Sequence, residues 1–198
     1  MIKYFFIVSL INFLCVEKSY SNFHKMHCDS TKSKSRLISV EDINLKKYSV
    51  KNKNSVFIFL DVDCPISQYY TKTLQDTFLR YSGTNILFFT VFPTRYLHIE
   101  EISHFNKRYG LTIPSVLDKF QNITKYLNAT ITPEVVIINK NNEILYSGCI
   151  DDCYFALGKR NLNPQKTYLV DAIEAIINNK KPLISHSNSI GCEIQRIQ

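Results

Sequence analysis

The sequence predicts an α/β domain: a mixed sheet with central parallel strands and a closing antiparallel hairpin, flanked by helices. Short apolar runs, expected for strands buried on both faces, alternate with segments of helical periodicity from residue 55 onward. The 198 residues are 45% hydrophobic and 21% charged, which is enough for one sizeable core and typical of a globular chain.

The first half of the domain alternates strand and helix. VFIFLD predicts a buried strand over 56–61, and NILFFTVF predicts the next one over 85–92. Between them, apolar residues at helical spacing predict a helix over 66–81, which ends at Ser82-Gly83. A second apolar stripe, closed by Gly110, predicts another helix; it consists of Ile99, Ile102, Phe105 and Tyr109.

The second half closes the sheet. PSVLD predicts a short strand, and Phe120, Ile123 and Leu127 mark a short helix. EVVIIN, the turn KNN and EILYSG predict a hairpin, and a last amphipathic helix covers 168–177. The predicted order is β-α-β-α-β-α-β-β-α, in which strands joined through helices lie parallel and the hairpin is antiparallel.

The amino-terminal residues predict export. One Lys precedes an apolar run from Tyr4 to Val16, which is too short to span a bilayer comfortably. Ser19-Tyr20-Ser21 then places small residues where a signal peptidase needs them. We expect a signal peptide over 1–21, a polar leader over 22–48 and the domain with a C-terminal extension over 49–198, in a periplasmic or secreted protein. The alternatives are a lipoprotein modified at Cys15 and an uncleaved anchor.

The net charge of +7 favours acidic partners only in a general way. The lysines are scattered among Asn and Ser, with no arginine-rich run and no nucleic-acid motif. The sequence therefore indicates neither a nucleic-acid partner nor a cofactor.

Cys64 is the residue whose position most strongly indicates chemistry. It lies between a buried strand and Pro65, and a proline is well tolerated at the first position of a helix. Cys64 would then be the N-cap, where the helix dipole and free N–H groups stabilise a thiolate. Asp61 and Asp63 oppose this if they approach the sulfur. The competing interpretation is a small buried apolar cysteine.

Thr132-Pro133 directly precedes the first strand of the hairpin, opposite Cys64 in the predicted order. A cis bond here would leave the Thr132 carbonyl and N–H open to an extended thiol substrate, so Pro65, Thr132 and Pro133 would shape a substrate groove. The alternative is an ordinary trans proline at a strand start.

The chain resembles the secreted bacterial redoxin-type proteins of the thioredoxin-like superfamily, near the alkyl-hydroperoxide-reductase and thiol-specific-antioxidant group. The matching stretches span about residues 56–194 and include LDVDCPISQYY, YGLTIPSVLD, ATITPEVVIIN, YSGCIDDCY and GCEI. The resemblance implies a thioredoxin fold and thiol redox chemistry.

Two departures from this pattern matter. Ser67 replaces the second cysteine of Cys-x-x-Cys, so the neighbouring thiol that usually releases a mixed disulfide is missing. A peroxiredoxin has Thr or Ser three residues before its reactive cysteine, in a Pro-led loop. Here that residue is Asp61 and no such Pro precedes it, which argues against peroxidase activity.

Signal cleavage would leave an odd number of cysteines, so at least one should be free or reactive. GCIDDC ends the hairpin at the sheet edge where Cys64 lies, and Cys192 could also fold back. Each of these is a candidate resolving thiol. The alternative is a structural disulfide, either Cys149–Cys153 or Cys149–Cys192.

Metal binding is the rival class. Cleavage after Ser21 would expose Asn22-Phe23-His24, whose amine, amides and imidazole can hold Cu(II) in a square plane. The favoured function is thiol–disulfide exchange with protein or small-molecule thiols and disulfides as partners. The alternative is a non-catalytic copper-handling or thiol-binding module on the same scaffold, since a fold alone does not define an activity.

Overall fold

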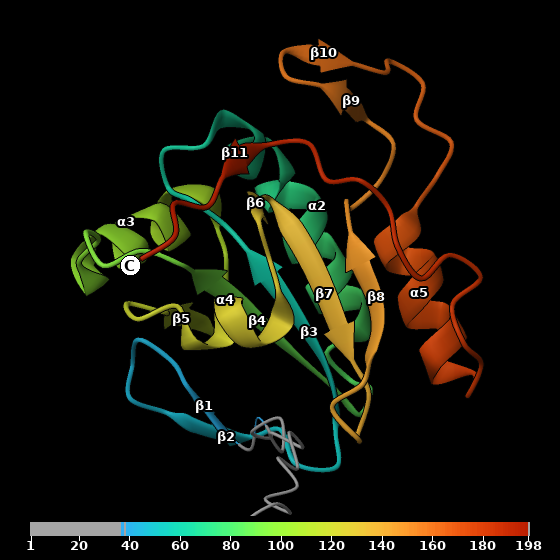
Figure 1. Ribbon diagram of the computed structural model, residues 1–198, viewed down its shortest axis with the longest axis horizontal. Coiled ribbons are helices and arrows are strands. Elements are labelled where there is room, and N and C mark those ends of the chain that lie inside the picture. Colours follow the sequence, from blue (N-terminus) through green and yellow to red (C-terminus); the bar gives the residue numbers. More distant parts are fainter. Residues whose placement is uncertain (1–36, 38, 198) are drawn as a thin grey trace, which may run out of the picture. The chain divides into compact units, whose positions relative to one another are not determined.

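A five-stranded mixed sheet forms the centre of the computed structural model, which describes residue 37 and residues 39–197 (Figure 1). The strands lie in the order β5-β4-β3-β7-β8. All five were predicted from the sequence, and the α/β class with its order of elements is confirmed. Their bounds are β3 (Asn54–Phe59), β4 (Ile86–Phe92), β5 (Ser115–Leu117), β7 (Glu134–Ile138) and β8 (Ile144–Gly148).

Strand direction follows the prediction except at β7. Strands β3, β4 and β5 are parallel, and β7 and β8 are antiparallel, as expected. However, β7 pairs antiparallel with β3, so the expectation that every helix-joined strand lies parallel was wrong. The connecting helix α4 (Asn122–Leu127) has 6 residues. Such a helix is roughly 9 Å long, too short to carry the chain back across the sheet.

Two antiparallel steps, β3 to β7 and β7 to β8, make β8 parallel to β3. The carboxyl ends of β3 and β8 therefore lie at the same edge of the sheet, together with the start of β7. This edge is where the candidate site forms.

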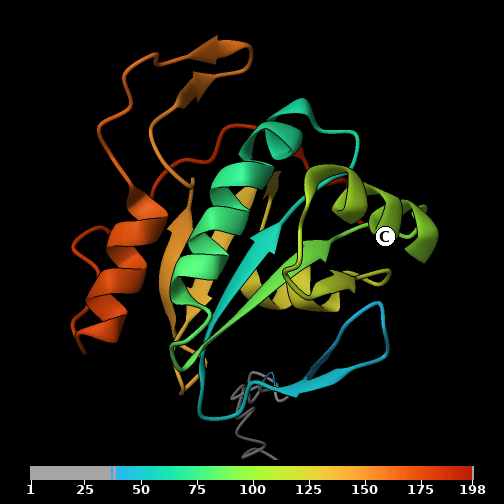
Figure 2. The ribbon, with the colours of Figure 1, turned by 180° about the vertical axis from the view of Figure 1, so that it is seen from behind.

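Helices lie on both faces of the sheet, as Figures 1 and 2 show from opposite sides. Side chains of α2 (Pro65–Tyr81), α3 (Ile99–Tyr109) and α5 (Tyr168–Ile177) share one apolar core with Val56, Ile58 and the facing residues of β7. The other face packs Phe57, Phe59 and Phe89 against α4. Residues that alternate along β3 thus enter different cores, as expected for a strand buried on both faces.

The helix boundaries agree with the sequence signals. Pro65 is at the first position of α2, directly after the N-cap Cys64. Helix α3 begins with a capping box, in which the His98 N–H donates to the Glu101 carboxylate at 2.8 Å. It ends at Gly110, whose φ of 66° is the left-handed conformation that favours glycine.

The described end of the predicted polar leader forms a small hairpin of β1 (Ser39–Glu41) and β2 (Lys47–Ser49). The Asp42 carboxylate organises its turn by accepting hydrogen bonds from the Lys46 N–H and the Tyr48 hydroxyl. The predicted signal peptide, Cys15 and the His24 site lie outside the described residues. Within the part of the chain that is described, no helix is long and apolar enough to cross a membrane.

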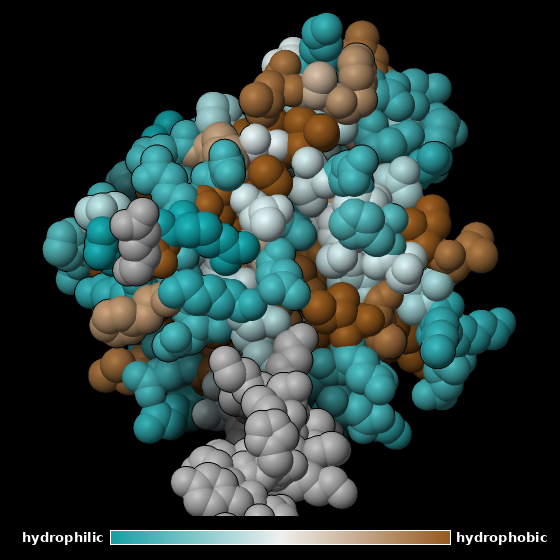
Figure 3. Space-filling view, viewed as in Figure 1, coloured by the Kyte–Doolittle hydropathy of each residue, from teal (hydrophilic) through white to brown (hydrophobic). Residues whose placement is uncertain are grey.

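A second short ribbon was not predicted. Strands β9 (Tyr154–Ala156) and β10 (Lys159–Arg160) form an arm that projects beyond the sheet edge (Figure 1). Apolar side chains gather over it in Figure 3, in agreement with the exposure of Phe155, Leu157 and Leu162. Tyr69 of α2 and Tyr154 of β9 hold its base, with their ring centroids 5.2 Å apart.

The chain after α5 returns across the sheet edge. It first runs along β8, where the Ser187 N–H donates to the Ser147 carbonyl and the Ser147 N–H donates to the Ser185 carbonyl, both at 3.0 Å. It then forms β11 (Cys192–Glu193), which pairs antiparallel with β6 (Ile131–Thr132). We call residues 190–197 the Cys192 segment.

Candidate functional site

Cys64 lies at the N-cap of α2, five residues after the end of β3. Its backbone is extended, with φ −76° and ψ 115°, and its carbonyl accepts the first helical hydrogen bond from the Gln68 N–H at 3.0 Å. The side chain is only 2% exposed. The strand therefore delivers a thiol to the positive end of a helix, in a site shielded from water.

Cys192 is the thiol that the fold brings to Cys64. Its backbone pairs with Thr132, and its Sγ donates to the Cys64 Sγ across 2.8 Å. The sequence had named Cys192 as one of three candidate partners, and the structure places it rather than Cys149 beside Cys64. A disulfide measures about 2.05 Å, so a two-electron oxidation would join the two sulfurs after only a small movement.

The predicted Thr132–Pro133 element also reaches the site. The bond is cis, as expected, and Pro133 directly precedes β7. The Cys64 Sγ lies 3.2 Å from the Thr132 carbonyl oxygen, to which a protonated Cys64 donates. Pro65 and Pro133 thus border the same thiol from α2 and from the start of β7.

The two thiols are electrostatically unequal. Burial opposes ionisation of Cys64, but hydrogen bonds from the Cys192 thiol and from the backbone and hydroxyl of Ser67 outweigh it and lower the pKa of Cys64. Burial, the hydrogen bond to Cys64 and the nearby negative charges of Cys64 and Asp61 raise the pKa of Cys192 to about 12. Within the pair, Cys64 therefore ionises more readily than Cys192.

The two acidic residues before Cys64 were expected to oppose its ionisation if they approach the sulfur. The Asp61 carboxylate accepts a hydrogen bond from the Asp63 N–H at 2.9 Å, and Asp63 is exposed. Asp61 contributes to the raised pKa of Cys192, whereas neither acid is among the causes of the Cys64 shift. Asp61 thus increases the difference in pKa between Cys64 and Cys192.

Cys149 and Cys153 belong to a separate polar cluster. The Cys149 Sγ lies 3.1 Å from the Ser187 hydroxyl, and the Cys153 Sγ lies 3.3 Å from the Tyr69 hydroxyl. Tyr70 donates to Asp151 between them. All four described cysteines are free thiols. The structure therefore contains neither of the two structural disulfides considered from the sequence.

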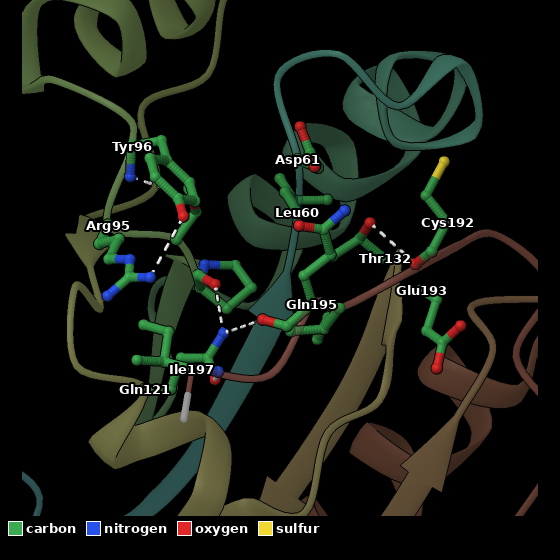
Figure 4. Close-up of a pocket in the computed structure, with 13 residues that line it drawn as sticks. Leu60, Asp61, Arg95, Tyr96, Gln121, Thr132, Cys192, Glu193, Gln195 and Ile197 are labelled. Atoms are coloured by element: carbon green, nitrogen blue, oxygen red, sulfur yellow. Dashed lines mark hydrogen bonds between the residues drawn. The ribbon is translucent and has the colours of Figure 1, made fainter.

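A cavity of about 330 Å³ lies beside the Cys192 segment (Figure 4). Arg95 and Tyr96, from the loop after β4, face Thr132 and Cys192 across it. The Tyr96 hydroxyl accepts a hydrogen bond from the Arg95 guanidinium at 3.2 Å.

Gln121 holds the Cys192 segment and was missed in the sequence analysis. Its side chain is fully buried, donates to the Gln195 carbonyl at 2.6 Å and accepts from the Ile197 N–H at 3.0 Å. No sequence pattern marks Gln121. Gly191, directly before Cys192, was a usable signal, since a glycine next to a reactive thiol often permits close backbone approach.

The described residues contain no group of three or more His, Cys, Asp or Glu side chains arranged to hold a metal ion.

This architecture is a thioredoxin-like fold, and comparison with solved structures agrees. The chain is similar to a hypothetical protein of Sinorhizobium meliloti, with 19% identity over 80% of this chain and 90% of that one and a TM-score of 0.67. It is equally similar to an uncharacterized conserved protein of Geobacillus kaustophilus, with 20% identity over 81% and 88% of the chains and a TM-score of 0.68.

A candidate thioredoxin of Neisseria meningitidis is a more distant neighbour. It has 22% identity over 58% of this chain and 77% of that one, and a TM-score of 0.51. No family model matches the sequence. No curated protein matches it either. At these identities the comparisons establish the fold, and the function has to be argued from the site.

Proposed function

We propose that the protein is an exported thiol–disulfide oxidoreductase in which Cys64 is the nucleophile and Cys192 the resolving thiol. The observation that carries the proposal is the 2.8 Å contact between the two sulfurs, with Cys192 donating to Cys64. A thiolate with a lowered pKa beside a second thiol is the arrangement that disulfide exchange requires.

The reaction proceeds in two exchanges. The Cys64 thiolate attacks one sulfur of a disulfide R–S–S–R′, forms a Cys64–S–S–R bond and releases R′–S⁻. Cys192 then loses its proton to the departing thiolate or to water and attacks the Cys64 sulfur. This second step forms the Cys64–Cys192 disulfide and releases R–S⁻, so two electrons pass from the protein to the substrate. A thiol reductant restores both cysteines, and the same steps in reverse oxidise a dithiol.

The substrate groove in this proposal is bordered by Pro65, Thr132 and Pro133. The partners are thiols and disulfides of proteins or small molecules. Ser67, the counterpart of a second Cys in Cys-x-x-Cys, is a fully buried residue that supports the thiolate. Cys192, which lies in a different part of the chain, would thus resolve the mixed disulfide in place of the missing second cysteine.

The test is a mixed-disulfide assay on full-length protein. Reduced wild type, Cys64→Ser and Cys192→Ser are mixed with a small aromatic disulfide, and release of the aromatic thiol is followed by absorbance. Wild type should release two thiols per protein through these cysteines. Cys192→Ser should release one and retain the other as an adduct on Cys64, and Cys64→Ser should lose the fast phase.

Cys153→Ser is the control, because Cys153 is buried and contacts Tyr69 instead of Cys64. Its adduct should resolve as in wild type. Persistence of the adduct in Cys153→Ser but not in Cys192→Ser would refute the resolving role of Cys192. A wild-type protein that binds the probe without releasing thiol would favour the thiol-binding module.

Export is tested separately by sequencing the amino terminus of protein isolated from its native cell envelope. The proposed signal peptide requires a start at Asn22. A start at Met1 in the cytoplasmic fraction would refute export, and a lipid on Cys15 would establish the lipoprotein alternative.

A further inference from the structure

The Cys192 segment lies on β6 as a strand. Cys192 pairs with Thr132 and Glu193 pairs with Ile131. The Thr132 hydroxyl donates to the Cys192 carbonyl at 3.3 Å, and the Ile194 N–H donates to the Thr130 carbonyl at 2.8 Å. Main-chain pairing of this kind is how an extended peptide adds to a free strand edge.

The contacts on either side of Cys192 depend on side-chain identity. At Gly191 an added Cβ would lie 2.0 Å from the Thr132 carbonyl oxygen, so any larger residue forces the segment away from β6. Two positions after the cysteine, Ile194 is 5% exposed and packs in the core beneath the sheet. The edge of β6 therefore accommodates a glycine before the cysteine and a large apolar residue two positions after it.

The same segment covers the nucleophile. Cys64 is 2% exposed, and its sulfur is in contact with Cys192 and Thr132. A substrate strand that pairs with Thr132 has to occupy the place of Cys192. An intramolecular competitor acts at an effective concentration of about millimolar, so an external peptide competes poorly until the segment is weakened.

We propose that the β6 edge is a binding site for an extended peptide of the pattern glycine–cysteine–any residue–large apolar residue, and that residues 191–194 are its resident occupant. The inference rests on the proposed function in taking the peptide's cysteine, held in a disulfide, as the sulfur that Cys64 attacks. It goes further in naming the class of protein substrate: an exposed, unpaired strand that carries this pattern.

The experiment uses full-length protein with Gly191→Ala, which weakens the resident strand, and Gly83→Ala as the matched control. Gly83 has no atom within 4 Å of an added Cβ. Alkylation of Cys64 by iodoacetamide is measured by peptide mass mapping. We expect Gly191→Ala to react about tenfold faster than wild type, because overpacking against the backbone opens the segment. Gly83→Ala should react as wild type does.

Synthetic peptides then probe the opened site. The first has the sequence of residues 188–197 with Cys192→Ser, so that it binds without exchange. It should restore protection of Cys64 in the Gly191→Ala protein. The same peptide with Gly191→Val or with Ile194→Asp should not protect. A second protein variant, Ile194→Ala, weakens the packing of the segment against the core. It replaces Gly191→Ala in the experiment if that variant fails to fold.

Equal alkylation of Cys64 in wild type and in both opened variants would overturn the inference, and so would equal protection by all three peptides. Failure of the proposed function is distinguishable. If wild type shows no disulfide exchange but the opened variant still discriminates among the peptides, the proposed enzyme activity is refuted and the peptide site is retained. Exchange without peptide protection would remove only the peptide site.

Discussion

The described chain holds two pairs of cysteines at the same edge of the sheet, and they differ in what their sulfurs contact. Cys64 and Cys192 contact each other, and the second thiol donates to the first. Cys149 and Cys153 contact hydroxyl groups of Ser187 and Tyr69. The first pair is arranged for sulfur chemistry, whereas the second takes part in a polar cluster.

The comparison shows that spacing in the sequence is a poor guide to thiol function. Cys149 and Cys153 are four residues apart, but local backbone proximity does not give their sulfurs a redox partner here. Cys64 and Cys192 are 128 residues apart in the sequence. The two-residue pairing of β11 with β6 places Cys192 beside Cys64. Burial opposes ionisation in both pairs: hydrogen bonds outweigh it at Cys64, whose pKa falls, but not at Cys149, whose pKa rises.

The strongest test of the comparison removes one cysteine from each pair. Cys64→Ser should reduce the rate of disulfide exchange to the background, because the nucleophile is lost. Cys149→Ser should change the rate by no more than about twofold, as expected of a substitution away from the reacting atoms. The measurement is thiol release from an aromatic disulfide at neutral pH. A comparable loss in both variants would show that the pairs act together.

The second test breaks the polar cluster without touching a thiol. Tyr70 donates to Asp151, and the Asp151 carboxylate also accepts from the Cys153 N–H at 2.8 Å. Tyr70→Phe removes one donor from a half-buried carboxylate and should lower the free energy of unfolding by about 1–3 kcal/mol in urea denaturation.

The control for that variant is Tyr96→Phe, because Tyr96 is 73% exposed. Its effect should stay within about 0.5 kcal/mol. If the Tyr70→Phe protein is as stable as this control, the cluster around Cys153 does not contribute to folding.

The pH dependence of stability should have opposite signs for Cys64 and Cys149. Hydrogen bonds lower the pKa of Cys64 on folding, so its contribution is full above the pKa of the unfolded thiol and is lost as pH falls through the folded pKa. Burial raises the pKa of Cys149, so its contribution is full below the unfolded pKa and is lost as pH rises through the folded value.

Urea denaturation of wild type, Cys64→Ser and Cys149→Ser between neutral and alkaline pH measures this difference. The stability gap between wild type and Cys64→Ser should widen as pH rises, and the gap to Cys149→Ser should narrow. Gaps that change in the same direction would contradict the assignment of the two pKa shifts.

The smallest expected effect comes from Ser67→Ala. The Ser67 hydroxyl is one of several groups that lower the pKa of Cys64, and the backbone amide and Cys192 remain in the variant. The alkylation rate of Cys64 near neutral pH should fall by about two- to threefold, because less of the thiol is ionised. Ser82→Ala, at the opposite end of α2, is the matched control. An unchanged rate in Ser67→Ala would assign the shift to Cys192 and the helix terminus.

Local signals were sufficient for most of the fold. The apolar runs of β3 and β4 and the proline after Cys64 predicted the strand–helix junction that positions the nucleophile. The signals failed where geometry depends on distant contacts. The direction of β7 depends on how far the short helix α4 reaches, and β1 and β2 lie in a lysine-rich stretch without apolar periodicity.

The partner of Cys64 illustrates the same limit within the site. Strand β11 has two residues, too few for any periodicity, and its pairing with β6 joins parts of the chain that no local pattern connects. The sequence placed Cys192 among three candidates. Only the three-dimensional pairing of Cys192 with Thr132 distinguishes it from Cys149 and Cys153.

The separation of 128 residues between the two sulfurs has a consequence for biosynthesis. A ribosome that adds about 5–20 residues per second needs roughly ten seconds to proceed from Cys64 to Cys192. Throughout that interval the nascent polypeptide carries Cys64 without the strand that covers it and without the Cys192 thiol that lowers its pKa. Any oxidant or oxidase that meets the emerging chain encounters Cys64 alone, and a translation product that stops before residue 192 retains that unprotected thiol permanently.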